Sequence, residues 1–210
     1  MSEKAPSVIV VSAPSGAGKS TVLSRVLCEV PGLRFSVSHT TRRPRRGETD
    51  GVEYHFVGRA AFLALQKEGA LLESAVVHGE LYGTSWFEYQ RAEREGVDLL
   101  LDVDVQGAAQ VRARLDDAVA VFVLPPSFAA LEARLRGRGD ASEEIIRRRL
   151  QAAGEEVGHY GEYDYLVVNE ELEACVSTVV AVVKAARARV SRMTATASQV
   201  LGTFPVRKES

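Results

Sequence analysis

Lys19 and Ser20 end a glycine-rich stretch, Ala13-Pro-Ser-Gly-Ala-Gly-Lys-Ser20. The stretch matches the G-x-x-x-x-G-K-[ST] pattern of a phosphate-binding loop, with Ala13 in place of the first glycine. In such a loop the backbone N–H groups surround the phosphates of a nucleotide, and the lysine ammonium approaches the β- and γ-phosphates. The serine hydroxyl is suited to bind Mg²⁺. The sequence therefore predicts a nucleoside triphosphate site.

A carboxylate follows at the end of another predicted strand. The mostly apolar run of residues 97–102 ends in Asp102, and Asp104 comes two residues later. A strand that ends beside a phosphate loop can deliver a carboxylate that orients Mg²⁺ and its water ligands. The alternative interpretation is an ordinary polar strand end, which we would prefer if the phosphate loop were absent. With the loop present, we expect Asp102 to hold the metal ion through water.

Arginines gather in two places in a chain whose net charge is only −2. The first cluster comprises Arg42, Arg43, Arg45 and Arg46, and the second lies within residues 134–149. Local basic clusters in a slightly acidic chain suit a small anionic ligand better than a nucleic acid. For the second cluster, the pattern fits a movable lid and a solvated charged surface about equally well.

These residues need a scaffold in which several strands end side by side. Residues 8–12 form a buried apolar run before the loop, and residues 22–27 have helical apolar spacing after it. Further strands are indicated near residues 35–38, 97–102, 118–124 and 163–169, with helices between them. This alternation is typical of an α/β fold with a parallel sheet flanked by helices.

The same order of predicted elements divides the chain into a core, an inserted lobe and a lid. The core comprises residues 1–37, 85–126 and 158–192, the last of these ending in a long helix over 172–192. Residues 38–84 form an inserted mixed α/β lobe, with a turn at 79–83, and residues 127–157 form a helical lid. Residues 193–210 lack periodicity, so we expect a flexible tail.

Composition narrows the class of protein. The chain has 210 residues with 46% hydrophobic and 26% charged residues, which is typical of a globular α/β domain. It has a polar N-terminus without a signal peptide and no apolar stretch near the ~20 residues that span a bilayer. Cys28 and Cys175 lack metal or redox spacing. We expect a cytoplasmic protein with no membrane or nucleic-acid partner. The sequence leaves open whether the protein forms a homo-oligomer.

The chain resembles bacterial guanylate kinases, a family of nucleoside monophosphate kinases, from about residue 7 to residue 192. Besides the phosphate loop, the matching stretches include an arginine-rich element that is far more specific to this family. They are Ser-Val-Ser-His-Thr-Thr-Arg-Arg-Pro-Arg-Arg-Gly-Glu at 36–48, Gly-x-x-Tyr at 51–54, Tyr-Gly-Thr at 82–84, Asp-Val-Asp-Val-Gln-Gly at 102–107, Arg-Leu-Arg-Gly-Arg-Gly at 134–139 and Val-Asn at 168–169. Ala13, and Thr84 where some relatives carry serine, are conservative departures.

The resemblance implies a P-loop NTPase-type fold and transfer of the γ-phosphoryl group of ATP to GMP, with Mg²⁺ as cofactor. It implies that the lobe binds GMP through Ser38, Arg42, Arg45, Tyr54, Glu73, Tyr82, Thr84 and Asp104. It implies that ATP contacts Ala13, Pro14, Ser15, Gly16, Ala17, Gly18, Lys19, Ser20, Thr21, Arg134, Arg138 and Asn169. The catalytic residues would be Lys19, Arg42, Arg138 and Arg149, and the metal residues Ser20 and Asp102.

The chemistry of this reaction supports the same interpretation. A phosphate monoester has a second pKa near 6, so at pH 7 GMP is already mostly a dianionic nucleophile. No general base is then needed, but two anions must be brought together by fixed positive charges. Two other hypotheses stay open. One is a catalytically silent guanylate-kinase-like interaction module, which tends to have a degraded phosphate loop. The other is a kinase of another phosphorylated acceptor, which would leave Glu73 and Thr84 unexplained.

Overall fold

The main sheet has five strands, all parallel, in the order β2-β7-β1-β8-β9. The computed structural model describes residues 5–77, 79–137 and 142–204. The strands are β1 (Val8–Ser12), β2 (Leu33–Phe35), β7 (Asp98–Asp102), β8 (Val119–Leu124) and β9 (Tyr165–Val168). β1 is buried along its whole length because it pairs with a neighbour on each side and helices pack on both faces of the sheet. The predicted α/β fold is confirmed.

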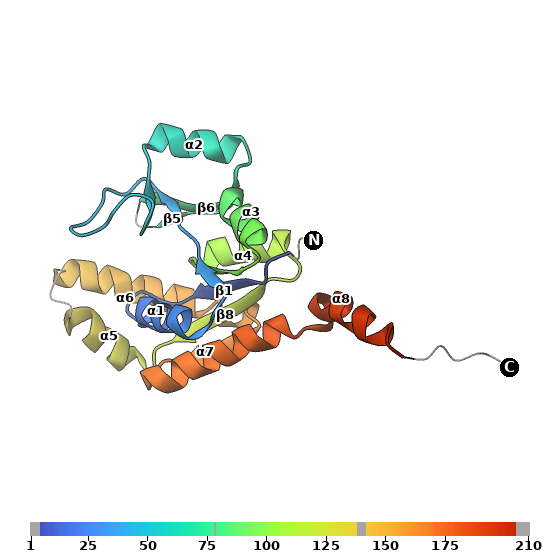
Figure 1. Ribbon diagram of the computed structural model, residues 1–210. Helices are drawn as coiled ribbons and strands as arrows, with labels where there is room; N and C mark the ends of the chain where they lie inside the picture. The colour runs from blue at the N-terminus through green and yellow to red at the C-terminus, as the bar shows by residue number, and fades with distance from the viewer. Residues whose placement is uncertain (1–4, 78, 138–141, 205–210) are drawn as a thin grey trace.

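Helices cover both faces of this sheet (Figure 1). One face packs against α1 (Lys19–Glu29) and α7 (Leu172–Arg187) through a cluster rich in valine. The other face packs against α3 (Trp86–Glu95) and α4 (Val105–Arg114). In the parallel register Val11 lies opposite Asp102, so β1 and β7 end together and place the phosphate loop beside the strand-end carboxylate.

The inserted lobe is built on a second sheet of order β4-β3-β6-β5. Its elements are β3 (His39–Thr40), β4 (His55–Phe56), α2 (Arg59–Lys67), β5 (Leu71–Val77) and β6 (Glu80–Ser85). The turn predicted at 79–83 is wrong. Only the start of that segment turns, and β6 then pairs antiparallel with β5 from Glu80 to Ser85. Phe62 on α2 is fully buried against Leu71 and Leu81 and gives the lobe a small core of its own.

A helical arm lies on the other side of the phosphate loop and consists of α5 (Phe128–Gly137) and α6 (Glu143–Val157). A serine caps each of these helices, since the Ser127 hydroxyl accepts from Ala130 N at 3.1 Å and the Ser142 hydroxyl from Ile145 N at 3.4 Å. The two helices bury Leu131, Leu135, Ile146 and Ala153 between them. A short 3₁₀ turn, η1 (Tyr160–Glu162), leads back to β9.

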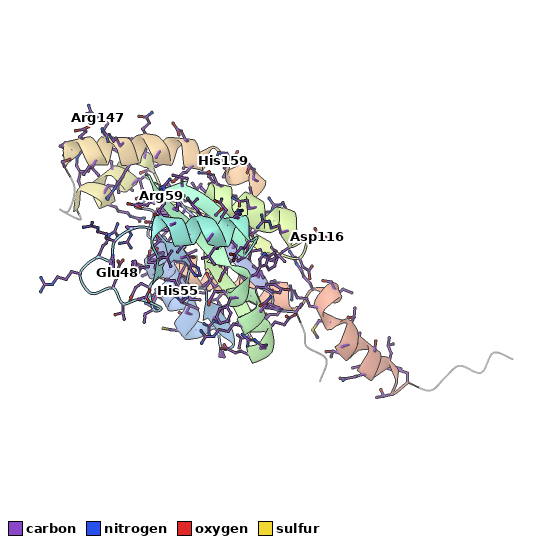
Figure 2. The ribbon with its side chains drawn as sticks, turned by 90° about the horizontal axis from the view of Figure 1, so that it is seen from above. Glu48, His55, Arg59, Asp116, Arg147 and His159 are labelled. Carbon is purple, nitrogen blue, oxygen red and sulfur yellow. The ribbon has the colours of Figure 1, made fainter. Side chains whose placement is uncertain are left out.

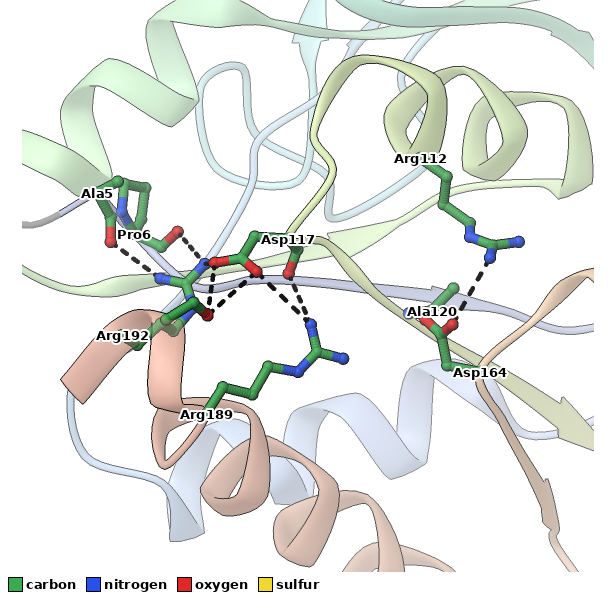
Figure 3. A network of polar contacts seen from close by, with 9 residues as sticks. Ala5, Pro6, Arg112, Asp117, Ala120, Asp164, Arg189 and Arg192 are labelled. Carbon is green, nitrogen blue, oxygen red and sulfur yellow. Dashed lines mark hydrogen bonds and ion pairs between the residues drawn. The ribbon is translucent and has the colours of Figure 1, made fainter. Parts of the chain in front are cut away.

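The C-terminal segment differs from its prediction. The helix expected over 172–192 ends at Arg187, and a separate helix α8 (Val190–Leu201) includes much of the segment expected to be a flexible tail. The base of α8 is anchored because Arg192 donates to the carbonyls of Ala5 and Pro6 and pairs with Asp117 (Figure 3). This anchoring joins residues more than 180 positions apart, so local periodicity could not reveal it.

Among the described residues, no helix combines the length and the apolar character that crossing a membrane requires.

Candidate active site

The phosphate loop, the strand-end carboxylates and the lobe line one cavity of about 350 Å³. Its core wall is formed by residues 13–16, 18–21 and 102–104, and its lobe wall includes Arg42, Arg45, Tyr54, Glu73 and Tyr82. The arm adds a single described residue, Glu156. Seen from above, Glu48 on the lobe loop and Arg147 on α6 lie toward the same end of the molecule (Figure 2).

The phosphate loop owes its shape to two glycines with left-handed backbone. Gly16 has φ +96° and Gly18 has φ +91°, where other residues would be strained. A Cβ on Gly18 would also lie 2.5 Å from the Asn169 amide nitrogen. Gly18 is the N-cap of α1, so the helix N-terminus and the loop amides share one electropositive end. This geometry suits an anion.

Lys19 extends from the first turn of α1 across the end of β7. Its ammonium forms an ion pair with Asp102 and donates to the Val103 carbonyl at 3.2 Å. Asp102 therefore holds the lysine side chain in the cavity. Ser20 and Asp102 both line the cavity, and their hydroxyl and carboxylate are the hard oxygen donors that Mg²⁺ prefers. The residues present thus fit this ion.

Two residues predicted to contact ATP lie directly behind the loop. The buried Asn169 donates from Nδ2 to the Ala17 carbonyl at 2.7 Å. Arg134 on α5 donates to the same carbonyl at 3.2 Å and to the Asn169 carbonyl at 2.9 Å. Both side chains brace the loop from outside the cavity lining. Arg149 is likewise not among the lining residues, and Arg138 lies outside the described residues.

On the lobe wall, Arg42 is held by several partners at once. Its guanidinium donates to both carboxylate oxygens of Glu48, at 2.8 and 2.9 Å, and to the Tyr82 hydroxyl at 3.2 Å. It also lies 5.3 Å from the centroid of the Tyr54 ring and 5.7 Å from that of Phe56. The hydrogen bond to Glu48 raises the pKa of Arg42, and the bond from Arg42 lowers the pKa of Glu48. Arg42 is thus a fixed cation.

Glu73 points into the cavity from β5 and is only 3% exposed. It accepts from Thr84 N at 2.6 Å, and the Thr84 hydroxyl lies 3.0 Å from the Ser38 hydroxyl. Burial raises the pKa of Glu73 to about 7, against the opposing effect of its hydrogen bonds to Thr84. A desolvated acceptor of this kind strongly favours a ligand that donates to it.

Gly107 and Asp104, at the start of α4, keep Glu73 in place. A Cβ on Gly107 would lie 2.6 Å from Glu73 Oε2, so only glycine leaves room for the carboxylate. Asp104, the N-cap of α4, accepts from Gly107 N at 2.8 Å and lines the same cavity. Tertiary packing thus brings Glu73, Thr84, Ser38 and Asp104 together, as the resemblance implies.

Comparison with known proteins agrees with this geometry. The family model for guanylate kinase matches residues 5–186. A guanylate kinase from Aromatoleum aromaticum is 52% identical over 87% of this chain and 89% of its own, and one from Neisseria gonorrhoeae is 48% identical over 88% and 90%. The chain belongs to the guanylate kinase family. The crystal structure of guanylate kinase from Anaplasma phagocytophilum has the same fold, with a TM-score of 0.79, 31% identity, and coverage of 97% of this chain and 98% of that one.

Two carboxylates that line the cavity of this guanylate kinase family member, Glu48 and Glu156, are not among the predicted site residues. Glu48 was part of the matching arginine-rich stretch, and its position six residues after Arg42 in one loop was the available signal. Glu156 lies on the packed face of α6, three residues after the buried Ala153 and ten after the buried Ile146. An acidic residue on an otherwise apolar helix stripe is the signal that could have identified it.

Glu156 brings negative charge to the phosphate end of the cavity. Burial raises its pKa, while the Lys19 ammonium and the Ser15 backbone amide act in the opposite direction. Its Oε2 is buried and accepts no hydrogen bond from the described residues. The arm therefore contributes a carboxylate where the resemblance implies only arginines.

Proposed function

We propose that this protein transfers the γ-phosphoryl group of ATP to GMP, giving ADP and GDP. The observation that carries the proposal is the shared cavity. One wall is a phosphate loop with Lys19, and the other wall combines the fixed cation Arg42 with the buried acceptor Glu73. A donor triphosphate and a phosphorylated guanine nucleotide can therefore meet between the two walls.

The chemical requirement is to bring two anions together. Because the phosphate of GMP is mostly dianionic at pH 7, it needs orientation and charge compensation more than deprotonation. Lys19 and the loop amides would compensate the donor phosphates, and Arg42 and Arg45, with the hydroxyls of Tyr54 and Tyr82, would hold the acceptor phosphate. Fixed charges in a partly enclosed cavity act more strongly than the same charges in water.

Glu73 would select guanine. An ionised carboxylate can accept from N1–H and the 2-amino group of guanine at the same time. Adenine has no 2-amino group and a lone pair at N1, so AMP would leave the buried carboxylate without donors. Ser38 and Asp104, which line the cavity with Glu73, would supply the remaining polar contacts of this end of the cavity, and the buried Thr84 holds Glu73 through its backbone amide.

Ser20 and Asp102 would hold Mg²⁺ bound with the nucleotide, Asp102 through water. When bound, this ion supplies positive charge that bridges and neutralises donor phosphate oxygens. Asp102 also orients Lys19 through their ion pair, so removal of this carboxylate would disturb both functions.

The lobe of residues 38–84 and the arm of residues 127–157 would close on the core when both nucleotides are bound, which excludes water from the γ-phosphate. Closure would carry Arg138 and Arg149 to the transferred group, with Arg134 already bound to the loop.

We further propose a cytoplasmic location. The interaction-module alternative finds no support, because the relatives compared above are all named guanylate kinase.

A coupled assay of ADP release with GMP, dGMP, IMP, AMP and UMP tests the proposal. We expect turnover with GMP and at least ~10²-fold lower kcat/KM with AMP, the size of effect that unpaired buried polar groups produce. Equal rates with all acceptors, or ADP release that does not depend on any acceptor, would contradict it.

Small-angle scattering tests closure. The radius of gyration should be smaller with a bisubstrate analogue than without it.

A further inference from the structure

The lobe is joined to the core by two short connections that lie next to each other. In the outgoing connection, Ser36 N still donates to Leu100 O of the core sheet at 3.0 Å. Two residues later, Ser38 O accepts from His55 N of the lobe at 2.9 Å. The returning connection is the point where β6 ends at Ser85 and α3 begins at Trp86. Val37 therefore stands between the two bodies.

Glu88 contacts the outgoing connection from the start of the returning one. It lies in the first turn of α3 and is 0% exposed. Its Oε2 accepts from Val37 N at 3.0 Å, across 51 positions of sequence. One side chain thus ties the two connections of the lobe to each other.

The stabilising contacts of this carboxylate are few. Removing a carboxylate from water is costly, and an apolar side chain of similar volume is often at least as favourable. The compensation available to Glu88 is incomplete. Arg34 Nη2 is 3.7 Å away and Arg34 also pairs with Glu95 at 3.0 Å, while Glu88 Oε1 makes no hydrogen bond to the described residues. What Glu88 supplies instead is a fixed position for the Val37 amide.

We propose that Glu88 is a positioning residue that sets acceptor specificity by fixing Ser38 against Thr84. Val37 directly precedes Ser38, and Thr84 lies one residue before the cap of α3. The hydroxyls of Ser38 and Thr84 are 3.0 Å apart, and Thr84 N donates to Glu73 at 2.6 Å. Because the end of the cavity that would bind guanine depends on this alignment, a loosened Val37 displaces Ser38 without touching the phosphate loop. The proposal rests on the proposed function, in which the acceptor is GMP.

The test compares Glu88→Leu, Glu88→Asp and Glu88→Gln. Leucine removes the acceptor and aspartate withdraws it by one methylene, so both should raise KM for GMP by about tenfold, the order of effect that a small misplacement produces. Glutamine keeps an oxygen at the right distance and should stay within about threefold of the parent protein. KM for ATP and kcat at saturating GMP should change little in all three, and amide exchange at Val37 should quicken only with leucine and aspartate.

Glu95→Leu is the matched control, since it removes the other carboxylate partner of Arg34 and leaves the Val37 contact intact. It should not change KM for GMP. Unchanged KM in Glu88→Asp, or equal increases in the Glu88 and Glu95 variants, would overturn the proposal even if Glu88→Leu fails to fold. If the parent protein neither binds nor phosphorylates GMP, the proposed function fails, whereas Val37 exchange still reports on the positioning role.

Discussion

The lobe and the arm both carry arginine clusters, but they hold them in different ways. In the lobe, Arg42 is fixed in the cavity by Glu48, Tyr82 and the Tyr54 ring. In the arm, Arg136 and Arg148 pair at the surface with carboxylates of their own or the adjacent helix, and among the described residues of the arm only the acidic Glu156 lines the cavity. The lobe is therefore preorganised for an anion, whereas the contribution proposed for Arg138 and Arg149 of the arm depends on the proposed closure.

This difference indicates how specificity and turnover are divided. A preformed cation and a buried acceptor bind one ligand without paying for rearrangement. A segment that must move can act only after its ligands are in place. Variants in the lobe should therefore alter acceptor affinity, and variants that disturb the shared phosphate loop or the arm should alter steps that involve the donor.

The largest effect is expected at the element that both regions share. Lys19→Ala should lower kcat by at least ~10²-fold, because one preorganised electrostatic contact is commonly worth that much. Binding of GMP should change little, since the lysine faces the phosphate loop and Asp102. Steady-state kinetics and calorimetric titration with GMP measure the two quantities. Lys67→Ala, at the exposed end of α2, is the control. Rates within a few-fold of the parent protein would contradict the phosphate-loop assignment.

Glu73 tests the lobe as the source of specificity. Glu73→Ala should reduce kcat/KM for GMP by about 10²-fold, because the ligand loses a desolvated charged acceptor. KM for ATP should barely move. IMP keeps N1–H but lacks the 2-amino group, so it should be a poor substrate of the parent protein and lose less on mutation. Equal losses for GMP and IMP would show that Glu73 does not contact the 2-amino group.

The raised pKa of Glu73 also predicts a pH dependence of stability. The folded protein holds this proton up to a pKa of about 7, above the ordinary value of 4.5. Ionisation of Glu73 therefore lowers the free energy of unfolding progressively as pH rises through that interval. Glu73→Gln should be more stable than the parent protein at pH 8, by about 3 kcal/mol at most, and should lose this advantage below pH 4.5. Urea unfolding at both pH values measures the difference.

Arg42→Lys tests whether the preorganised lobe cation needs its planar shape. An ammonium cannot reproduce the two-pronged contact with Glu48 or the stacking on Tyr54, so KM for GMP should rise about tenfold with a smaller change in kcat. Arg43→Lys is a matched control on the exposed neighbouring arginine. An unchanged KM for GMP in Arg42→Lys would show that positive charge alone, not the fixed planar guanidinium of Arg42, binds the acceptor.

The smallest effect is expected at the acidic residue of the arm. Glu156→Gln removes a like charge from the phosphate end of the cavity, so magnesium-free tripolyphosphate should bind about threefold more tightly, and less so at high salt. Calorimetric titration measures the affinity. Glu155→Gln changes the exposed neighbouring residue, which does not line the cavity, and should have no effect. Weaker binding in Glu156→Gln would mean that the arm carboxylate assists the phosphates.

Sequence by itself determined the local features. The phosphate loop, its flanking strand and helix, the caps Ser127 and Ser142, and the apolar run that ends in Asp102 follow from patterns within a few residues. The family resemblance extended this to most of the residues that line the cavity. Short-range patterns suffice here because backbone conformation, capping and the period of a helix or strand depend on near neighbours.

Only the tertiary structure decided which distant residues meet. The contact of Glu88 with Val37 spans 51 positions, Asn169 reaches the phosphate loop across 152, and the bonds from Arg192 to Ala5 and Pro6 anchor α8 across more than 180. Such contacts arise from the way whole elements fill space around a shared core, and that arrangement has no signature within any one segment.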